Sequence, residues 1–260
     1  MDHKQLKELG FPYPENVLLL LEGGSKLHGA KLEGTDDTDW YGLYVEPAEI
    51  VLGLEEFEHF VYSTGGRPGG NGPQDVDLTM YGLRKFARLA CKGNPSVLHF
   101  FFAKPRFAHP LWSRLREQRS LFFARNDVEQ FLGYADSQLK RLYNERSKDV
   151  NRHALEAAHG YDTKFAMHLI RLLGEVKEFV ESGRITLPRP NVAELIEIRL
   201  GKYKLSELID WAKQLQQEAE EAKGRSPLPD KVDKTAVSRV ICSVYQDFWQ
   251  LRGKESGRHA

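Results

Sequence analysis

Residues 21–45, with the sequence LEGGSKLHGAKLEGTDDTDWYGLYV, combine a glycine-rich turn with a cluster of acidic side chains. The turn at 23–25 directly follows a short apolar run at 17–22, which we predict to be a buried strand. Three aspartates then occupy four positions, 36–39, at the start of a second predicted strand at 38–45. Because clustered carboxylates repel one another, this arrangement indicates that a cation binds among them.

Asp37 and Asp39 are the first candidate metal ligands. They lie two residues apart in a strand-like segment, so their side chains are expected on the same face. Oxygen ligands of this kind suit hard divalent cations, Mg²⁺ or Mn²⁺. Sites for two ions draw on further carboxylates or substrate phosphates, and Asp77, on a later strand at 75–81, is a candidate third carboxylate. Asp75 shares the polar face of that strand and remains the alternative.

The glycine-rich turn is a candidate phosphate site. Its backbone N–H groups can approach an anion closely because Gly24 has no Cβ atom, and the hydroxyl of Ser25 adds a donor. Beside a pair of metal-binding carboxylates, the turn indicates a site for a nucleoside triphosphate (NTP) and two metal ions. The chemistry expected there is attack of an acceptor on the α-phosphorus. Asp36, in contrast, is expected to be solvated and to have no chemical role.

The predicted secondary structure changes character along the chain. Strands are expected at 17–22, 38–45, 57–63 and 75–81, with a mobile glycine-rich loop at 64–74. Helices are expected at 1–9, 82–93, 129–146, 154–181, 191–199, 205–223 and 235–251. We therefore predict an α+β fold, with a catalytic domain at 1–125 that contains a mixed sheet and a helical domain at 126–260.

The composition is that of an ordinary folded protein, with 37 basic and 37 acidic residues. A nucleic acid would therefore need a local basic patch, for which Arg84, Arg88 and Lys92 on one helix face are candidates; a solvated outer face is the alternative. Cys91 and Cys242 are predicted to be buried, reduced thiols. No segment approaches the roughly 18 apolar residues of a membrane helix, so a soluble, cytoplasmic protein is expected.

A polar stripe runs along the predicted helix at 154–181. Lys164, His168, Arg171 and Glu175 are spaced by four, three and four residues and therefore share one side. The cations of this stripe could hold the triphosphate. In the alternative, the stripe is a solvated face with an ordinary Arg171–Glu175 pair. The aromatic segment at 99–107 is predicted to belong to the core.

Two motifs together resemble the signature of the polymerase-beta-like nucleotidyltransferases. They are GGSKLHG (23–29) and TDDTDWYGLYV (35–45), in which Gly-Ser is followed about a dozen residues later by Asp-x-Asp. Four further segments are similar to the predicted nucleotidyltransferases named for an RNA repair pathway: DVDLTMYGLRKFARLACKGNPSVLHFFFAKP, GYDTKFAMHLIRLL, ESGRITLPRP and IEIRLGKYKLSELI. The similarity keeps its order over roughly residues 17–209.

The resemblance implies a polymerase-beta-like nucleotidyltransferase domain, followed by a helical domain that closes the nucleotide cleft. The implied catalytic and metal-binding residues are Asp37, Asp39 and Asp77. The predicted nucleotide-binding residues are Gly24, Ser25, Lys164, His168 and Arg171, and the resemblance includes all of these except Arg171. His99 departs from the family pattern, which has a glutamate there, and is expected to be a partly buried histidine.

The function implied is transfer of a nucleoside monophosphate from an NTP to an acceptor hydroxyl, with two Mg²⁺ or Mn²⁺ ions and release of pyrophosphate. The association with RNA repair implies an RNA 3′ end as acceptor and RNA-repair proteins as possible partners. Transfer to a protein or small-molecule hydroxyl remains an alternative, as does an inactive module that binds nucleotide or RNA. The sequence leaves open which NTP is used.

Overall fold

The structure is a computed structural model that describes residues 1–256 except 33, 35, 66–73 and 145–149. The strands are β1 (Val17–Glu22), β2 (Thr38–Tyr44), β3 (His59–Ser63), β4 (Val76–Gly82) and β5 (Phe107–Ala108). The helices of the first half are α1 (His3–Glu8), α2 (Gly24–Leu27), α3 (Ala48–Leu52), α4 (Leu83–Ala90), α5 (Pro95–Leu98) and α6 (Pro110–Glu117), with a 3-10 turn, η2, at His99–Phe101. Those of the second half are α7 (Val128–Asn144), α8 (Val150–His159), α9 (Thr163–Ser182), α10 (Val192–Arg199), α11 (Leu205–Lys223) and α12 (Lys234–Ser256).

The strands form one mixed sheet in the order β3-β4-β2-β1-β5. β2 and β4 are parallel neighbours, whereas the other neighbouring strands are antiparallel. The register places Asp39 of β2 opposite Asp77 of β4. Because paired residues project from the same face of a sheet, the two carboxylates lie side by side.

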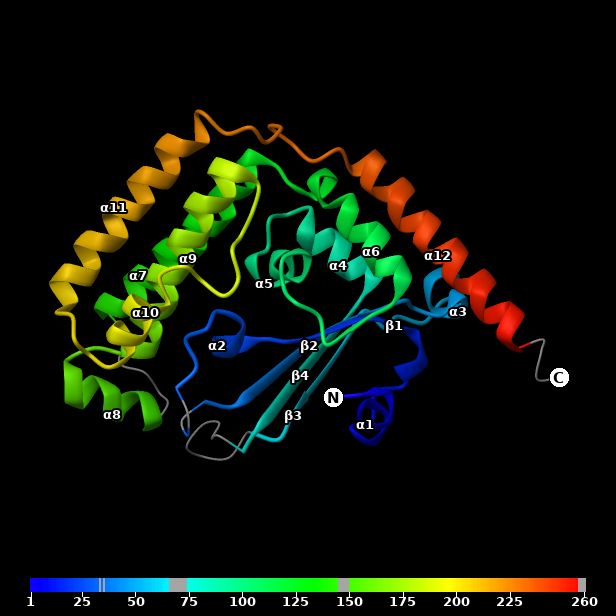
Figure 1. The fold of residues 1–260 in the computed structure, drawn as a ribbon, viewed down its shortest axis with the longest axis horizontal. Helices are drawn as coiled ribbons and strands as arrows, with labels where there is room; N and C mark the ends of the chain where they lie inside the picture. The colour runs from blue at the N-terminus through cyan, green and yellow to red at the C-terminus, as the bar shows by residue number, and fades with distance from the viewer. Residues whose placement is uncertain (33, 35, 66–73, 145–149, 257–260) are drawn as a thin grey trace.

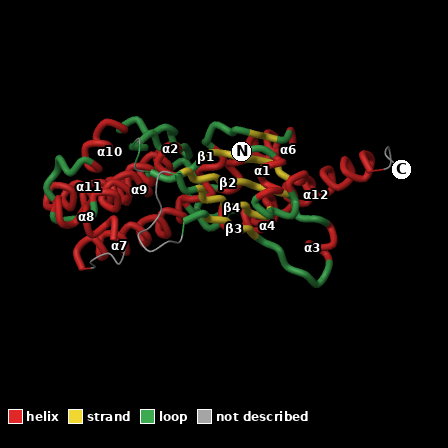
Figure 2. The backbone as a smooth tube through the Cα atoms, turned by 90° about the horizontal axis from the view of Figure 1, so that it is seen from below, coloured by secondary structure: helices red, strands yellow, loops and turns green. Residues whose placement is uncertain are grey.

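Helices cover one face of the sheet (Figure 1): α4 contacts β2 and β4, and α6 contacts β1. The larger hydrophobic core lies under these helices and continues into the second half of the chain, where α9 packs against α7, α10 and α11. A smaller core on the opposite face joins Leu6 and Phe11 to Leu78 and Met80. Figure 2 shows the helices α7–α11 at one end of the sheet and α12 extending past the other.

The predicted α+β class is confirmed, as are all four predicted strands, within one or two residues at their ends. The helix predicted at 154–181 is divided into α8 and α9. Gly160 has a φ of 80°, which ends the helical path, and the carboxylate of Asp162 then caps α9 by accepting a hydrogen bond from the Phe165 N–H at 2.9 Å. The two-residue strand β5 was not predicted, since it is too short to show an alternating pattern.

The last helix, α12, returns to the first half of the chain and packs against α4 and α6. Its Tyr245 hydroxyl donates to the buried carboxylate of Glu46 at 2.5 Å, and Trp249 Nε1 donates to the Glu46 carbonyl at 3.0 Å. The domain boundary expected after residue 125 stays a prediction. A helical domain beginning at 126 would include α12, which packs against the sheet half.

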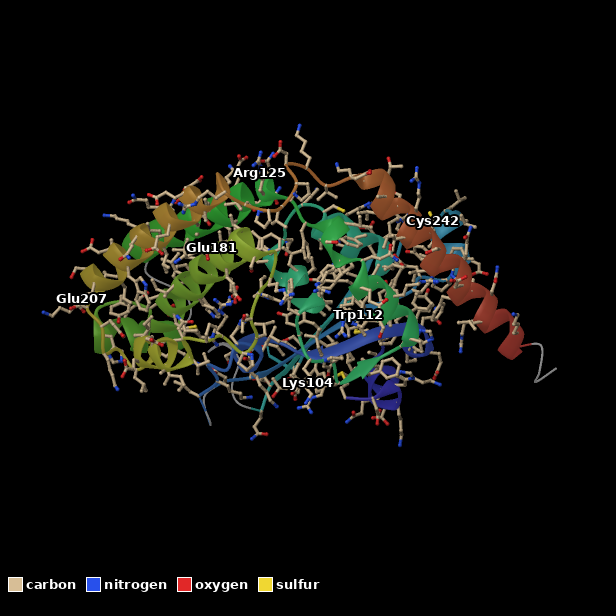
Figure 3. All side chains as sticks on the ribbon, turned by 45° about the horizontal axis from the view of Figure 1, so that its top comes forward. Lys104, Trp112, Arg125, Glu181, Glu207 and Cys242 are labelled. Atoms are coloured by element: carbon tan, nitrogen blue, oxygen red, sulfur yellow. The ribbon has the colours of Figure 1, made fainter. Side chains whose placement is uncertain are left out.

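The aromatic segment at 99–107 contributes Phe100 and Phe101 to the core, as predicted, and Phe101 stacks there on the buried Trp112. Cys242 on α12, in contrast, is exposed (Figure 3). The prediction of two buried cysteines is therefore wrong for Cys242, because it lies on the outer side of its helix; Cys91 is half-buried. Most of the loop predicted at 64–74 lies outside the described residues. Among the described helices, none has the length and apolar character needed to span a bilayer.

Candidate active site

Asp37, Asp39 and Asp77, here called the aspartate trio, come together at the end of the helix-covered face of the sheet. Each offers a carboxylate oxygen within 4.8 Å of the others. The register of β2 and β4 accounts for the pairing of Asp39 with Asp77, and the period of two along a strand brings in Asp37. Asp75 is not part of this group; its carboxylate accepts a hydrogen bond from Thr64 Oγ1 at 2.9 Å.

The electrostatics of the trio fit a bound cation. Burial, followed by the charges of Asp37 and Asp77, raises the pKa of Asp39 from 3.8 to about 6, while the charge of Lys164 opposes the shift. A divalent cation among the three carboxylates would remove this unfavourable interaction. The donor set consists of oxygen atoms alone, which fits Mg²⁺ or Mn²⁺.

Only glycine fits at position 24, because the turn passes close to the Asp39 carboxylate. The φ of Gly24 is 57°, and a Cβ atom at this position would lie 1.8 Å from Asp39 Oδ2. The preceding residue, Gly23, donates its N–H to the Asp39 carbonyl at 2.9 Å, so the turn is tied to β2 beside the carboxylate. The predicted proximity of the glycine turn to the aspartates is thus present in the structure.

Asp36 has a structural role, and the expectation that it is solvated is wrong. It is only 2% exposed and accepts hydrogen bonds from Arg199 Nη1 and Nη2 at 2.5 and 2.8 Å. The hydroxyl of Ser25 also donates to Asp36, at 2.9 Å. Burial alone would raise the pKa of Asp36, but the hydrogen bonds from Arg199 hold this pKa well below its usual value. The pair therefore ties the glycine turn to α10 in the second half of the chain.

Arg199 was not predicted as a site residue. It lies in the segment IEIRLGKYKLSELI, which resembles the family, but its place in a helical pattern does not indicate that it contacts Asp36. Its guanidinium also donates to the Ala30 carbonyl at 2.9 Å.

Lys164, predicted to bind phosphate, lies beside the trio. Its Nζ is 3.6 Å from Asp36 Oδ1, its side chain is 34% exposed, and its charge acts on Asp39. It is thus a cation at the edge of the acidic cluster that remains accessible to a ligand.

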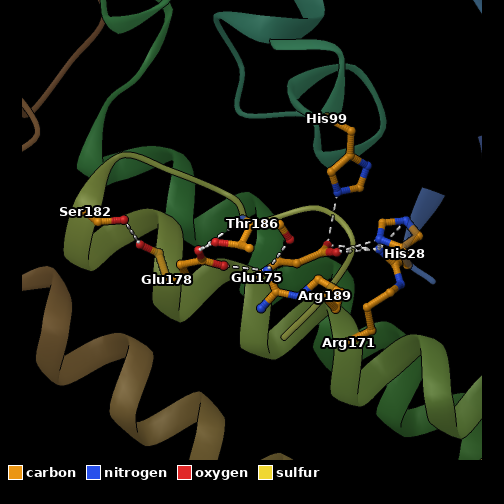
Figure 4. Close-up of polar contacts among 8 residues, drawn as sticks. All are labelled: His28, His99, Arg171, Glu175, Glu178, Ser182, Thr186 and Arg189. Carbon is orange, nitrogen blue, oxygen red and sulfur yellow. Dashed lines mark hydrogen bonds and ion pairs between the residues drawn. The ribbon is translucent and has the colours of Figure 1, made fainter. Parts of the chain in front are cut away.

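The polar stripe of α9 continues into a buried network of His28, His99, Arg171 and Glu175, here called the Glu175 network (Figure 4). Arg171 Nη1 donates to both oxygens of Glu175 at 2.9 Å, His28 Nδ1 lies 3.0 Å from Oε1, and His99 Nε2 lies 3.1 Å from Oε2. Glu175 is fully buried. The alternative of a solvated face with an ordinary ion pair is therefore wrong, because this side of α9 packs against His28, just after α2, and against His99 of η2.

His168 and Arg171 line a pocket of about 410 Å³. Gly24 and Tyr41 also line it, and Tyr41 follows Asp39 by two residues on β2, so the pocket lies next to the trio. Of the basic residues considered for RNA, Arg88 pairs with Glu58 at 2.7 Å on the outer side of α4.

The chain is similar to parts of a curated phage protein and of a solved bacterial structure. An uncharacterized 38.9 kDa protein from the nrdC-mobD intergenic region of Enterobacteria phage T4 is 27% identical over 123 residues, which are 45% of this chain and 36% of the phage protein. The chain thus matches little more than a third of that relative's length. The crystal structure of a nucleotidyltransferase-like protein from Exiguobacterium sibiricum 255-15 aligns with 94% of this chain and 74% of its own, at 13% identity and a TM-score of 0.30.

The family comparison covers most of the sequence. The model of the RNA repair pathway DNA polymerase beta family matches residues 2–240, a span that includes the trio, the glycine turn and the Glu175 network. The chain belongs to the RNA repair pathway DNA polymerase beta family.

Proposed function

We propose that the protein is a metal-dependent nucleotidyltransferase, which transfers a nucleoside monophosphate from an NTP to an acceptor hydroxyl and releases pyrophosphate. The observation that carries the proposal is the convergence of three carboxylates from β2, β4 and the segment before β2, next to a glycine turn that only glycine can form. Membership of the family supports the same reaction class.

The trio would hold Mg²⁺ or Mn²⁺, two ions when the nucleotide is present. Bound there, the ions would supply charge neutralisation at the phosphates and a lowered pKa for the acceptor hydroxyl. Asp77 is proposed to accept the proton of that hydroxyl on a carboxylate oxygen. Lys164 is proposed to neutralise the β- and γ-phosphates.

Gly24 and Ser25 are proposed to form the phosphate turn through different groups. The backbone at Gly24 faces the trio closely, whereas the Ser25 hydroxyl is committed to Asp36. We therefore assign the phosphate contacts to backbone N–H groups of the turn and the fixing of its shape to the Ser25 side chain.

The acceptor is proposed to be an RNA 3′ end. The support for an RNA acceptor is the RNA repair association of the family. The formal charge of the whole chain is zero, so net charge does not add to this support. RNA affinity through a local patch predicts a linear fall of the logarithm of the binding constant with the logarithm of salt concentration. The helical residues from 126 onward are proposed to close over the nucleotide, with Lys164 as their contribution beside the trio.

The test is an incubation of the purified protein with each of the four α-labelled NTPs, Mg²⁺ or Mn²⁺, and single-stranded RNA with a free 3′ hydroxyl. The double variant Asp37→Ala/Asp39→Ala is assayed in parallel. A matched control, Asp210→Ala, removes an exposed aspartate on α11 far along the chain from the trio.

We expect label on the RNA with the parent and with Asp210→Ala, and none with the double variant. Label on the protein or on an added small molecule would keep the transfer reaction and overturn the RNA acceptor. Equal labelling by the parent and the double variant would refute the role of the trio. Stabilisation by ATP and Mg²⁺ without any transfer would favour an inactive binding module.

A further inference from the structure

The pocket beside the trio has walls from both halves of the chain. Tyr41 of β2 and Phe100 of η2 belong to the sheet half, while Tyr134 of α7 and Phe165 of α9 belong to the helical half. The Tyr41 and Phe100 rings are 6.1 Å apart between centroids. Its volume of about 410 Å³ falls within the usual range for small-molecule sites. Aromatic side chains therefore border the pocket from two sides.

The charges around the pocket cancel. Arg171 is the cation on its wall, and it is neutralised by the buried carboxylate of Glu175, 2.9 Å away. Burial, together with the charge of Arg171, lowers the pKa of His28 to about 3, so this imidazole is uncharged at neutral pH. Lys164, in contrast, lies next to the trio and does not line the pocket. Polyanionic phosphate therefore fits the Lys164 side of the site, and an uncharged ligand fits the pocket.

His168 supplies a directional polar group inside the pocket. Burial and the nearby charges of Arg171 and Lys164 lower its pKa well below the usual value, so its ring is neutral and carries one donor and one acceptor nitrogen. Within the part of the chain that the structure describes, no hydrogen bond of this ring is found. A ligand with its own donor and acceptor would satisfy it.

The two histidines of the Glu175 network are, with Glu175, a second group that could hold a metal ion. The guanidinium of Arg171 already contacts both oxygens of Glu175 and lies 2.9 Å from His28 Nε2. A fixed cation at this point opposes the binding of a second one. We therefore interpret the network as the support of the pocket wall.

We propose that this pocket binds a nucleobase, stacked against its aromatic walls and recognised by the two ring nitrogens of His168. The proposal rests on the proposed function, because it names the group that lies next to the transferred phosphate. The base could be that of the incoming NTP or that of the 3′-terminal nucleotide of the acceptor. Both sources present the same flat ring with donors and acceptors on its edge.

The test measures binding of nucleosides that carry no phosphate, together with inorganic tripolyphosphate as the matched ligand without a base. Calorimetric titrations are carried out on the parent and on His168→Ala, His168→Gln, Tyr134→Ala and Lys164→Ala. The control variant His159→Ala removes an exposed histidine at the end of α8. Tyr134 is 53% exposed, so its replacement leaves the core intact and keeps the test valid even if a His168 variant fails to fold.

We expect saturable binding of at least one nucleoside, weakened roughly tenfold by His168→Ala and roughly five- to tenfold by Tyr134→Ala. His168→Gln should retain binding but change the order of preference among the bases, and His159→Ala should match the parent. Tripolyphosphate affinity should be unchanged by Tyr134→Ala and His168→Gln and weakened by Lys164→Ala. Competition then identifies the source of the base: displacement of the nucleoside by an NTP assigns the incoming base, and displacement by a short RNA with a free 3′ hydroxyl assigns the acceptor base.

The proposal is overturned if no nucleoside binds, if tripolyphosphate is the ligand that depends on His168, or if His159→Ala weakens binding as much as His168→Ala. These results can be distinguished from failure of the proposed function. Nucleoside binding without any nucleotidyl transfer would refute the reaction and retain the base pocket. Nucleotidyl transfer whose base preference is unchanged by the His168 and Tyr134 variants would retain the reaction and refute the base pocket.

Discussion

Replacing Asp39 by asparagine should stabilise the metal-free protein. Burial and the neighbouring carboxylates raise the pKa of Asp39 from 3.8 to about 6, so its ionised form destabilises the folded state. A difference of about two pKa units corresponds to about 3 kcal/mol, and partial exposure to solvent reduces this to about 1–3 kcal/mol. The Asp39→Asn substitution would keep the size of the side chain while removing the charge.

The sign with pH follows from the same shift. The folded protein binds the Asp39 proton more tightly than the unfolded chain does, so deprotonation favours unfolding. The destabilisation is absent below about pH 4, grows between about pH 4 and 6, and is complete above pH 6. In EDTA, the advantage of Asp39→Asn should therefore be present at pH 7 and lost near pH 4.

Denaturant unfolding in EDTA, followed by circular dichroism at both pH values, checks this prediction against an Asp210→Asn control. Excess Mg²⁺ should reverse the order at pH 7, because a ligand that binds only the folded parent stabilises it by mass action. The reasoning is refuted if Asp39→Asn is less stable than the parent in EDTA at pH 7, or if the difference does not depend on pH.

Three further predictions concern the elements that surround the trio. Gly24→Ala should weaken metal binding at least tenfold by calorimetry, because its Cβ atom would clash with Asp39. Gly10 has a similarly positive φ but no atom within 4 Å of an added Cβ, so Gly10→Ala should leave metal binding unchanged. Equal effects of the two variants would contradict the role of the close contact between Gly24 and Asp39. Asp36→Ala should destabilise the fold by roughly 3–5 kcal/mol in denaturant unfolding, because it leaves Arg199 buried without its partner. The double variant Asp36→Leu/Arg199→Met should recover most of that loss. If the effects of the two single substitutions instead add up in the double variant, the two residues are not coupled. Glu175→Gln should lower the melting temperature by several degrees and weaken nucleoside binding, and unchanged nucleoside affinity would separate the Glu175 network from the pocket.

The strands and the three candidate aspartates could be predicted from the sequence because they follow from local periodicity. Alternation along a strand places Asp37 with Asp39, and it separates Asp77 from the apolar side chains of Leu78 and Met80. The parallel pairing of β2 with β4, which brings Asp39 beside Asp77, depends on contacts between distant parts of the chain. The sequence offered Asp77 as a candidate third carboxylate, but it did not predict that β4 pairs in parallel with β2.

The buried polar networks could not be predicted from the sequence. Asp36 lies among other aspartates and is separated from Arg199 by 163 positions, so no local pattern distinguishes it from a solvated residue. Glu175 and Arg171 have the spacing of an ordinary helix-surface pair, and only the packing of α9 against His28 and His99 buries them. In both cases tertiary contacts decide the environment of a charge whose local sequence carries no signal of burial.

Binding of Mn²⁺ to the trio is the most direct test of the central claim. Electron paramagnetic resonance of added Mn²⁺ counts the bound ions in the parent, in Asp37→Ala/Asp39→Ala and in Asp210→Ala, each with and without an NTP that cannot be hydrolysed between its α- and β-phosphates. We predict Mn²⁺ bound to the parent and to Asp210→Ala, with a second ion when the nucleotide is added, and a loss of at least tenfold in affinity for the double variant. Equal Mn²⁺ affinity in the parent and the double variant would contradict the account.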